Sequence, residues 1–382
     1  MANALHTFEE NFRKTVQAQH AFAFWKGRVS LYALLRALDI GSGHEVILPG
    51  YTCVMDVNPV TYVGARPVYV DIEPHTYNID INLLRTSITD KTKLILAQHT
   101  YGYPCDMDPI LELARQKDIP VVEDCCLALG SLYKGQLCGT MGLAAYWSFQ
   151  WNKPFTTGIG GMATTSDPDL ANRLQSLTAT ELQPPSARAA AMLSAQRLVY
   201  RTCIYPRTTA LATNLFRWLT RKGIVIGSSA TCEFQPKMPD GFFRGMSTAQ
   251  ARAGLRQLRR LDSILAHRRD MARFYDELLP QAGFQPSTIP SWMEPTLVRY
   301  PLRVADKQRA LAEAPRHFIE LGSWFESPLH PEETPLQAYG YEPGMCPIAE
   351  QACRDVVNLP THRRANRKTA ERTVAFVQQF GR

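Results

Sequence analysis

Three residues of the chain combine side-chain types that together can do covalent chemistry on a carbonyl compound. Lys153 lies between an apolar run and a glycine-rich turn, in the stretch SFQWNKPFTTGIGG. A lysine in such a place can be partly desolvated, which lowers its pKa and frees the amine for attack. Asp124 ends the run IPVVED, and Ser148 closes the run AAYWS. A carboxylate can hold a proton on a ring nitrogen, and a hydroxyl can donate to a phosphate.

These groups match what pyridoxal 5'-phosphate (PLP) requires of a protein, namely a lysine, a carboxylate partner for the pyridine nitrogen and donors for the phosphate. Gly27 and Arg28 precede a predicted helix, so its first N–H groups are expected to face that phosphate. Each residue taken alone also fits an ordinary role, as an exposed lysine, a helix-capping aspartate or a core serine. The prediction therefore depends on their occurrence together and in this order.

Alternating helical and strand-like segments can position these residues. Helical patterns and strand-like runs take turns along the first third of the chain: 30–40, 45–49, 54–64, 66–71, 82–88, 93–98, 106–118 and 119–124. Strands separated by such helices indicate βαβ units and a mainly parallel sheet with helices on both faces. Ligands bind at the carboxyl ends of the strands in these sheets. Asp124, Ser148 and Lys153 are therefore expected around one crevice, and Asp106 is expected to cap helix 106–118.

The length of 382 residues suits a large domain and a smaller one. We predict an α/β fold, with a three-layer αβα large domain at residues 1–245. Residues 246–382 are expected to form a long linking helix, at 246–279, and a smaller α+β domain with a strand at 296–304.

The net charge of +7 belongs to one segment of the chain. Residues 182–232 contain no Asp or Glu and seven Lys or Arg, which equals the whole basic excess. A charge confined in this way does not indicate a nucleic-acid partner. The segment can be a solvated lid, or it can contact anionic phosphates of a substrate. It can also rest on a membrane surface as a basic amphipathic helix, through Arg217, Trp218 and Arg221.

Several other classes of protein are disfavoured by the sequence. The nine cysteines include no C-x-x-C pair, so neither a zinc site nor a disulfide framework is expected. No signal peptide is recognised at the N-terminus, and no run approaches the roughly 20 apolar residues of a membrane span. The glycines at 158, 160 and 161 lack the spacing of a dinucleotide-binding loop. A cytoplasmic protein with reduced thiols is the expectation.

Several sequence blocks, in one order, resemble the DegT/StrS family of PLP-dependent sugar aminotransferases, which has the aspartate-aminotransferase (type I) fold. The blocks are GSGHEVILPGYT, YVGARPVYVDIEPHTYNID, VVEDCCLALGSLYKGQLCGTMGLAAYWSFQWNK, MSTAQARAGLRQLRRLD and PLHPEETPLQAYGY. The resemblance runs from about residue 22 to the C-terminus, and residues 182–235 match poorly.

The resemblance implies roles for individual residues. Lys153 would hold PLP as a Schiff base and move protons, Asp124 would partner the pyridinium, and Ser148 would bind the phosphate. Members with histidine in place of this lysine act as dehydratases, so the lysine implies transamination. The amino donor is typically glutamate, and the acceptor is a keto-sugar carried on a nucleotide diphosphate. His330 and Tyr339 fall where substrate-side residues are expected, and a homodimer is implied because family sites draw on both subunits.

The stretch before the first helix departs from the family pattern. Many members have Ser-Gly-Thr there, whereas this chain has Lys26, Gly27 and Arg28. The two cations can replace hydroxyls as phosphate ligands, or Lys26 can simply face solvent.

Four more positions depart from that pattern. Cys53 stands where an aromatic side chain commonly stacks on the cofactor ring, and Leu127 stands where Gln or His is common. Phe243 and Arg244 replace an Asn and a Tyr, of which the Asn reaches the neighbouring subunit's phosphate. Two further interpretations stay open. One is a PLP aminotransferase that acts on a carbonyl compound other than a nucleotide sugar, and the other is a PLP-binding protein without turnover.

Overall fold

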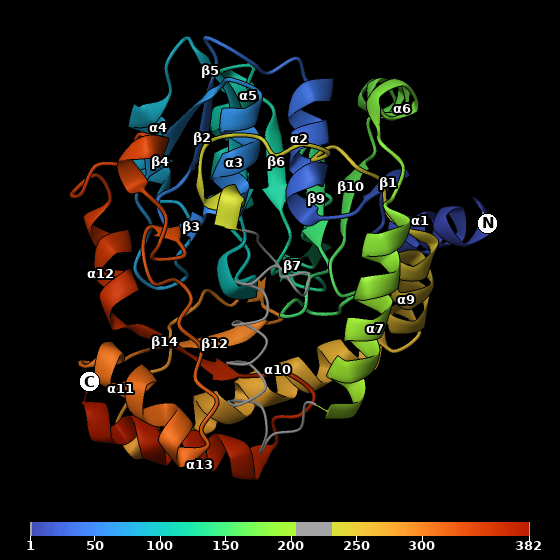
Figure 1. The fold of residues 1–382 in the computed structure, drawn as a ribbon. Coiled ribbons are helices and arrows are strands. Elements are labelled where there is room, and N and C mark those ends of the chain that lie inside the picture. Colours follow the sequence, from blue (N-terminus) through green and yellow to red (C-terminus); the bar gives the residue numbers. More distant parts are fainter. Residues whose placement is uncertain (1, 204–230, 382) are drawn as a thin grey trace.

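The computed structural model describes residues 2–203 and 231–381, and a seven-stranded sheet forms its centre (Figure 1). The order of its strands is β1-β10-β9-β6-β5-β2-β4. The strands are β1 (His20–Phe24), β2 (Glu45–Pro49), β4 (Arg66–Val70), β5 (Thr92–Gln98), β6 (Val121–Asp124), β9 (Ala144–Ser148) and β10 (Gly161–Thr165). All neighbouring pairs from β9 to β4 are parallel, and only β10 runs against its neighbours. The predicted mainly parallel sheet is confirmed.

Helices cover both faces of the sheet. They are α1 (Ala2–Thr15), α2 (Gly27–Ala37), α3 (Val54–Tyr62), α4 (Ile81–Ser87), α5 (Met107–Gln116), α6 (Pro168–Glu181) and α9 (Thr248–Leu258), and a further helix, α7 (Ala187–Cys203), lies against α9. Successive residues of a strand point to opposite faces. Leu94 and Leu96 of β5 therefore join the core under α2 and α3, while Ile95 and Ala97 join the core under α5. This alternation explains why the middle of the strand, residues 94–97, is apolar on both faces, and it confirms the three-layer αβα arrangement.

The C-terminal part of the chain packs beside one edge of these layers (Figure 1). Its helices and paired strands are α10 (Leu261–Leu278), β12 (Arg299–Arg303), α11 (Lys307–Glu313), α12 (Pro347–Asp355), β14 (Val356–Pro360) and α13 (Arg367–Val377). β12 and β14 pair antiparallel. The mixture of helices with a small antiparallel sheet agrees with the predicted α+β character. The boundary expected between residues 245 and 246 stays a prediction.

Short strands and 3-10 turns complete the described chain. The strands are β3 (Thr52–Cys53), β7 (Leu132–Tyr133), β8 (Gln136–Leu137), β11 (Met293–Glu294) and β13 (Leu329–His330). The turns are η1 (Thr100–Gly102), η2 (Thr231–Phe234), η3 (Pro280–Ala282), η4 (Ala314–His317), η5 (Leu336–Tyr339) and η6 (Gln378–Phe380). Within the described ranges, no helix is both long enough and apolar enough to span a membrane.

One local prediction was wrong, and another holds only in part. The single helix expected at 246–279 is two helices, because the backbone leaves the helical path at Arg260. The break lets α9 pack on α1 while α10 packs on α13. Asp106 stands at the start of α5 but does not cap it, because its carboxylate instead accepts a hydrogen bond of 2.7 Å from the Tyr133 hydroxyl.

The basic segment is described only in part. Its first portion, as far as residue 203, includes α7, which packs on α9. Arg217, Trp218 and Arg221, which the membrane interpretation would use, lie outside the described residues. That interpretation and the lid interpretation both stay predictions.

Candidate active site

Asp124 and Ser148 end two neighbouring parallel strands of the central sheet. β6 pairs with β9 so that Asp124 lies opposite Tyr146, two residues before Ser148. The Asp124 side chain is 4% exposed, and its Oδ1 accepts a hydrogen bond of 2.8 Å from the backbone N–H of Cys126. The rule that polar groups gather at the carboxyl edge of a parallel sheet therefore holds here.

Lys153 lies in the turn between β9 and β10, as the sequence predicted. Backbone hydrogen bonds close this turn: Lys153 N donates to Gln150 O at 3.1 Å, and Thr157 N donates to Phe149 O at 3.0 Å. The side chain is half-buried, and its Nζ lies 5.2 Å from the centre of the Trp324 ring. Trp324 comes from the C-terminal part of the chain, so the Lys153 amine faces a residue that is far from it in the sequence.

Asp56, a residue that sequence reasoning missed, joins this group. It lies in the first turn of α3, and its Oδ1 accepts a hydrogen bond of 2.7 Å from the Tyr146 hydroxyl. Burial and the nearby charge of Asp124 raise its pKa to about 7, although Tyr146, Lys153 and Arg28 act in the opposite direction. The charges of Asp124 and Lys153 thus both act on the Asp56 carboxylate, which supports their assignment to one site.

The N-terminus of α2 is pressed against the ends of β9 and β10 by glycines. A Cβ atom on Gly27 would lie 2.8 Å from the Cβ of Ser148, and a Cβ on Gly161 would lie 2.5 Å from the Cα of Gly27. Real Cβ atoms do not approach so closely, so both positions need glycine. The first turn of a helix, with its unpaired N–H groups and positive dipole end, is thereby brought to the Ser148 side chain.

Lys26 and Arg28 flank that first turn, and both contact the carboxylate of Glu233. Lys26 Nζ lies 2.9 Å from Oε2, and Arg28 Nη1 lies 2.7 Å from Oε1. Lys26 is 8% exposed, so the interpretation in which it faces solvent is wrong. Sequence reasoning missed Glu233, although one signal was available, because it is the first acidic residue after the acid-free segment 182–232.

Cys53 and His330 lie side by side, although 277 positions separate them. They are paired in register in the parallel ladder of β3 and β13. Burial and Asp56 raise the pKa of the Cys53 thiol to about 11. His330 Nδ1 lies 3.6 Å from Glu326 Oε2, and its ring packs at 5.6 Å from Phe325. The ladder brings the predicted substrate-side histidine to Cys53, the residue before α3.

Tyr339 is connected to the site through another side chain. Its hydroxyl donates to Asn58 Oδ1 at 2.7 Å, and Asn58 Nδ2 donates to the backbone oxygen of Glu233 at 2.7 Å. Tyr339 is 2% exposed. Its hydroxyl is thus engaged within the protein, and the predicted role in substrate binding stays a prediction.

The remaining departures from the family pattern lie in packed positions. Leu127 is 5% exposed, and Phe243 is 8% exposed, with its ring stacked on Phe24 at 6.0 Å. The Arg244 guanidinium lies over the Trp25 ring, at 5.2 Å from its centre. The amide or imidazole groups that the family pattern has at positions 127 and 243 are thus replaced by apolar side chains.

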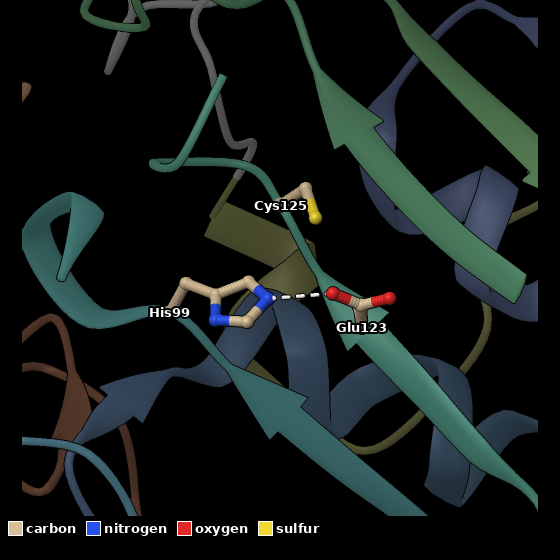
Figure 2. A group of neighbouring side chains, drawn as sticks. All are labelled: His99, Glu123 and Cys125. Carbon is tan, nitrogen blue, oxygen red and sulfur yellow. Dashed lines mark hydrogen bonds and ion pairs between the residues drawn. The ribbon is translucent and has the colours of Figure 1, made fainter. Parts of the chain in front are cut away.

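A second cluster, behind the site, joins His99, Glu123 and Cys125 (Figure 2). Their potential ligand atoms lie within 4.8 Å of one another, and all three residues are buried. Cys105 N donates to His99 Nδ1 at 2.9 Å, so Nε2 carries the proton and donates to Glu123 Oε2 at 3.0 Å. The hydrogen bonds therefore account for this His–Glu pair without a metal ion.

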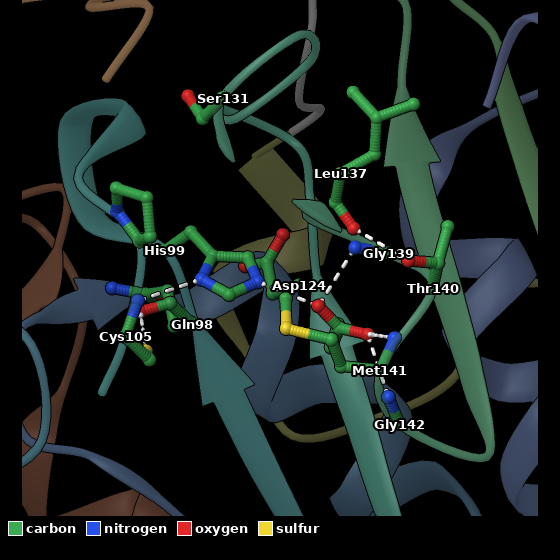
Figure 3. A network of polar contacts seen from close by, with 12 residues as sticks. Gln98, His99, Cys105, Asp124, Ser131, Leu137, Gly139, Thr140, Met141 and Gly142 are labelled. Carbon is green, nitrogen blue, oxygen red and sulfur yellow. Dashed lines mark hydrogen bonds and ion pairs between the residues drawn. The ribbon is translucent and has the colours of Figure 1, made fainter. Parts of the chain in front are cut away.

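Glu123 fastens the loop that leads into β9. The backbone N–H groups of Gly139, Met141 and Gly142 donate to its carboxylate at 2.7, 2.8 and 2.7 Å (Figure 3). Burial alone would raise the pKa of Glu123, but the hydrogen bonds from His99 and the backbone hold it below its usual range. Because Glu123 and Asp124 are successive strand residues, they face opposite sides of the sheet. Glu123 holds the loop before β9, and Asp124 lies on the side of the candidate active site.

Known proteins resemble this chain in sequence. A model of the DegT/DnrJ/EryC1/StrS aminotransferase family matches residues 1–194 and 210–378. The GDP-perosamine synthase of Caulobacter vibrioides is 36% identical over 72% of this chain and 62% of that enzyme, and the one of Escherichia coli O157:H7 is 42% identical over 45% and 47%. The chain thus spans less than two thirds of the length of these two relatives. The dTDP-4-dehydro-2,3,6-trideoxy-D-glucose 4-aminotransferase of Saccharopolyspora spinosa is 29% identical over 93% of this chain and 83% of that enzyme.

Solved structures resemble it in fold. DesV of S. venezuelae, crystallised in complex with a ketimine intermediate, matches with a TM-score of 0.76 and 25% identity, over 98% of this chain and 88% of that one. A DegT DnrJ EryC1 StrS aminotransferase from Brucella abortus matches with the same TM-score and 22% identity, over 99% and 90%. These matches agree with the predicted α/β fold.

Proposed function

Because the chain belongs to the DegT/DnrJ/EryC1/StrS aminotransferase family, we propose that it is a PLP-dependent sugar aminotransferase. The observation that carries this proposal is the convergence of Lys153, Asp124 and Ser148 at the carboxyl edge of one sheet. The same three residues are the ones that the family resemblance singles out.

The side chains of the site fit PLP. Asp124 offers a buried carboxylate to a ring nitrogen, and Lys153 offers an amine from the turn after β9. Ser148 offers a hydroxyl beside the N-terminus of α2. Lys26 and Arg28 add two cations at that helix end. An aldehyde, a pyridine nitrogen and a phosphate thus each have a chemically suitable partner.

When bound, PLP supplies an aldehyde that accepts an amino group and a ring that withdraws electrons. The Nζ atom of Lys153 is the nucleophilic amine, and it carries a proton to and from the substrate carbon as a general base and acid. The Asp124 carboxylate holds a proton on the ring nitrogen, and its own orientation is fixed by the Cys126 N–H. The Lys153 amine lies over the Trp324 ring, at 5.2 Å from its centre.

We propose glutamate as the amino donor and a keto-sugar linked to a nucleotide diphosphate as the acceptor. The names of the relatives, a GDP-perosamine synthase and a dTDP-sugar 4-aminotransferase, support this class of acceptor. We place His330 on the substrate side, because the β3–β13 ladder sets it beside Cys53 at the start of α3. We also propose a homodimer, the assembly in which family sites draw on both subunits.

The proposal is tested by following nitrogen from donor to acceptor. The purified protein with PLP is incubated with 15N-glutamate and GDP- or dTDP-linked 4-keto-sugars, and mass spectrometry detects the labelled amino-sugar. Lys153→Ala should abolish the product, while Lys117→Ala, which removes an exposed lysine, should leave it unchanged. A cofactor absorbance that no amino donor alters would instead indicate a PLP-binding protein without turnover. If only carbonyl compounds other than nucleotide-linked keto-sugars are aminated, the proposed acceptor class is wrong.

A further inference from the structure

We propose that the Glu233 carboxylate competes with the cofactor phosphate for Lys26 and Arg28, so that cofactor binding displaces this carboxylate from the two cations. This inference rests on the proposed function, since it concerns the phosphate of the same cofactor. It makes Glu233 a determinant of cofactor affinity, a role that the sequence pattern does not indicate.

The contact between Glu233 and the two cations is tight and buried. Lys26 Nζ lies 3.1 Å from Oε1 and 2.9 Å from Oε2, and Arg28 Nη1 lies 2.7 Å from Oε1. Glu233 is 3% exposed and Arg28 is 6% exposed. Charges taken out of water need partners of opposite sign. The two cations therefore form an anion-binding site, and in this structure the bound anion is the protein's own Glu233 carboxylate.

The location of this anion site matches what a cofactor phosphate needs. Lys26 and Arg28 flank Gly27, the first residue of α2, and Gly27 packs on Ser148. The N–H groups and the dipole of a helix N-terminus attract anions. The charge of Arg28 also lowers the pKa of Asp56 and Cys53 against the effect of their burial, so Arg28 acts on the same site as Asp124 and Lys153.

Two anions cannot share these cations without a penalty. A phosphate monoester carries a charge of about −1.5 to −2 at neutral pH, and a carboxylate carries −1. Side by side they repel each other, more strongly where water is excluded. The phosphate offers three oxygens, which suit the fork of an arginine and a lysine ammonium together. An exchange of one anion for the other keeps both cations next to an anion and avoids this repulsion, whereas simultaneous binding places two anions side by side.

The backbone of Glu233 is held in place, so the exchange requires only its side chain to move. Asn58 Nδ2 donates to Glu233 O at 2.7 Å, and Tyr339 fixes Asn58 through its hydroxyl. This arrangement keeps the carboxylate near the cations when no phosphate is present. We infer that Glu233 protects the two buried cations of the apo-protein and lowers its affinity for the cofactor.

The experiment compares two aldehydes that differ only in the phosphate. Full-length apo-protein is titrated with PLP and with pyridoxal, and the absorbance of the bound cofactor gives the dissociation constant of each. The ratio of the pyridoxal constant to the PLP constant isolates the phosphate contribution. Glu233→Gln should raise this ratio about tenfold, the order of magnitude for removing one close like charge, while pyridoxal binding changes little. Inorganic phosphate should also raise the thermal midpoint of Glu233→Gln more than that of the wild type.

A matched control uses the other end of the same helix. Glu181 forms an exposed ion pair with Arg36 of α2, so Glu181→Gln should leave the ratio unchanged. Lys26→Met should lower it. If Glu233→Gln folds poorly, Glu233→Asp, which withdraws the carboxylate by one methylene, should raise the ratio to a smaller extent.

An unchanged or lower ratio in the Glu233 variants would overturn the inference, because Glu233 would then organise the cations for the phosphate. Failure of the proposed function looks different. A wild type that binds PLP at Lys153 but transfers no amino group would refute the proposed function alone, whereas a wild type that binds neither aldehyde at Lys153 would refute both proposals.

Discussion

Replacing Asp56 with asparagine should change how the stability of the apo-protein depends on pH. The Asp56 carboxylate accepts a hydrogen bond from the Tyr146 hydroxyl of β9 and is subject to the charges of Asp124, Lys153 and Arg28. Burial and Asp124 raise its pKa to about 7, from a usual value of 3.8. Asparagine keeps the shape and can still accept from Tyr146, but it cannot ionise.

The sign follows from proton binding. Between pH 4 and pH 7, the unfolded chain has lost the Asp56 proton while the folded chain keeps it, so the stability of the wild type falls as the pH rises. A shift of about 3 pKa units corresponds to about 4 kcal/mol at most, at 1.36 kcal/mol per unit. Because Asp56 is partly exposed and interacts with Asp124, we expect about 2 kcal/mol of this to be measured.

Urea unfolding of the apo-protein at pH 5 and pH 8 measures this difference. Asp56→Asn should gain about 2 kcal/mol relative to the wild type between the two values. Asp108→Asn is the control, because Asp108 is exposed and its pKa is lowered by Lys134, so its removal cannot produce a gain. Parallel pH profiles for the wild type and Asp56→Asn would refute the reasoning, since the carboxylate would then ionise in the folded chain as it does in water.

Two more substitutions test how the site is supported. Glu123→Gln places an amide among backbone N–H groups that donate to a carboxylate in the wild type. It should therefore lower the free energy of unfolding, measured by urea titration, by about 2 to 4 kcal/mol. An unchanged free energy of unfolding would contradict the role of Glu123 in holding the loop before β9. Gly254→Val should cost about 1 to 3 kcal/mol, because a Cβ there would lie 2.3 Å from the Phe8 ring. Thermal unfolding measures that loss. Gly41→Val is the control and should cost less, because Gly41 has no positive φ and its Cβ would lie no closer than 3.4 Å to a neighbour.

Local patterns were sufficient for the parallel part of the sheet and for part of the site, but they did not indicate the antiparallel pair of β1 and β10. The apolar runs at 45–49, 93–98 and 119–124 indicated buried strands, and β2, β5 and β6 are found there. Asp124 and Ser148 could be placed because the carboxyl ends of parallel strands meet at one edge. The break at Arg260 could not be predicted, because nothing in the local sequence forbids a continuous helix. Packing against α1 and α13 decides it.

Long-range pairings were not predictable from one sequence. Glu233 is separated from Lys26 by 207 positions, and only the folded chain brings them together. Asp56 reads locally as an acid in the first turn of a helix, where it is favoured. Its raised pKa arises only because the fold sets it against Asp124. Such partners depend on the tertiary structure, and no spacing rule reports them.

The most direct test of the account is chemical identification of the cofactor lysine. The purified protein is loaded with PLP, reduced with borohydride and digested, and mass spectrometry locates the modified residue. We predict one stoichiometric pyridoxyl label, on Lys153, and none in Lys153→Ala. A label on another lysine, or no label after loading, would contradict the assignment of the site on which the proposed function depends.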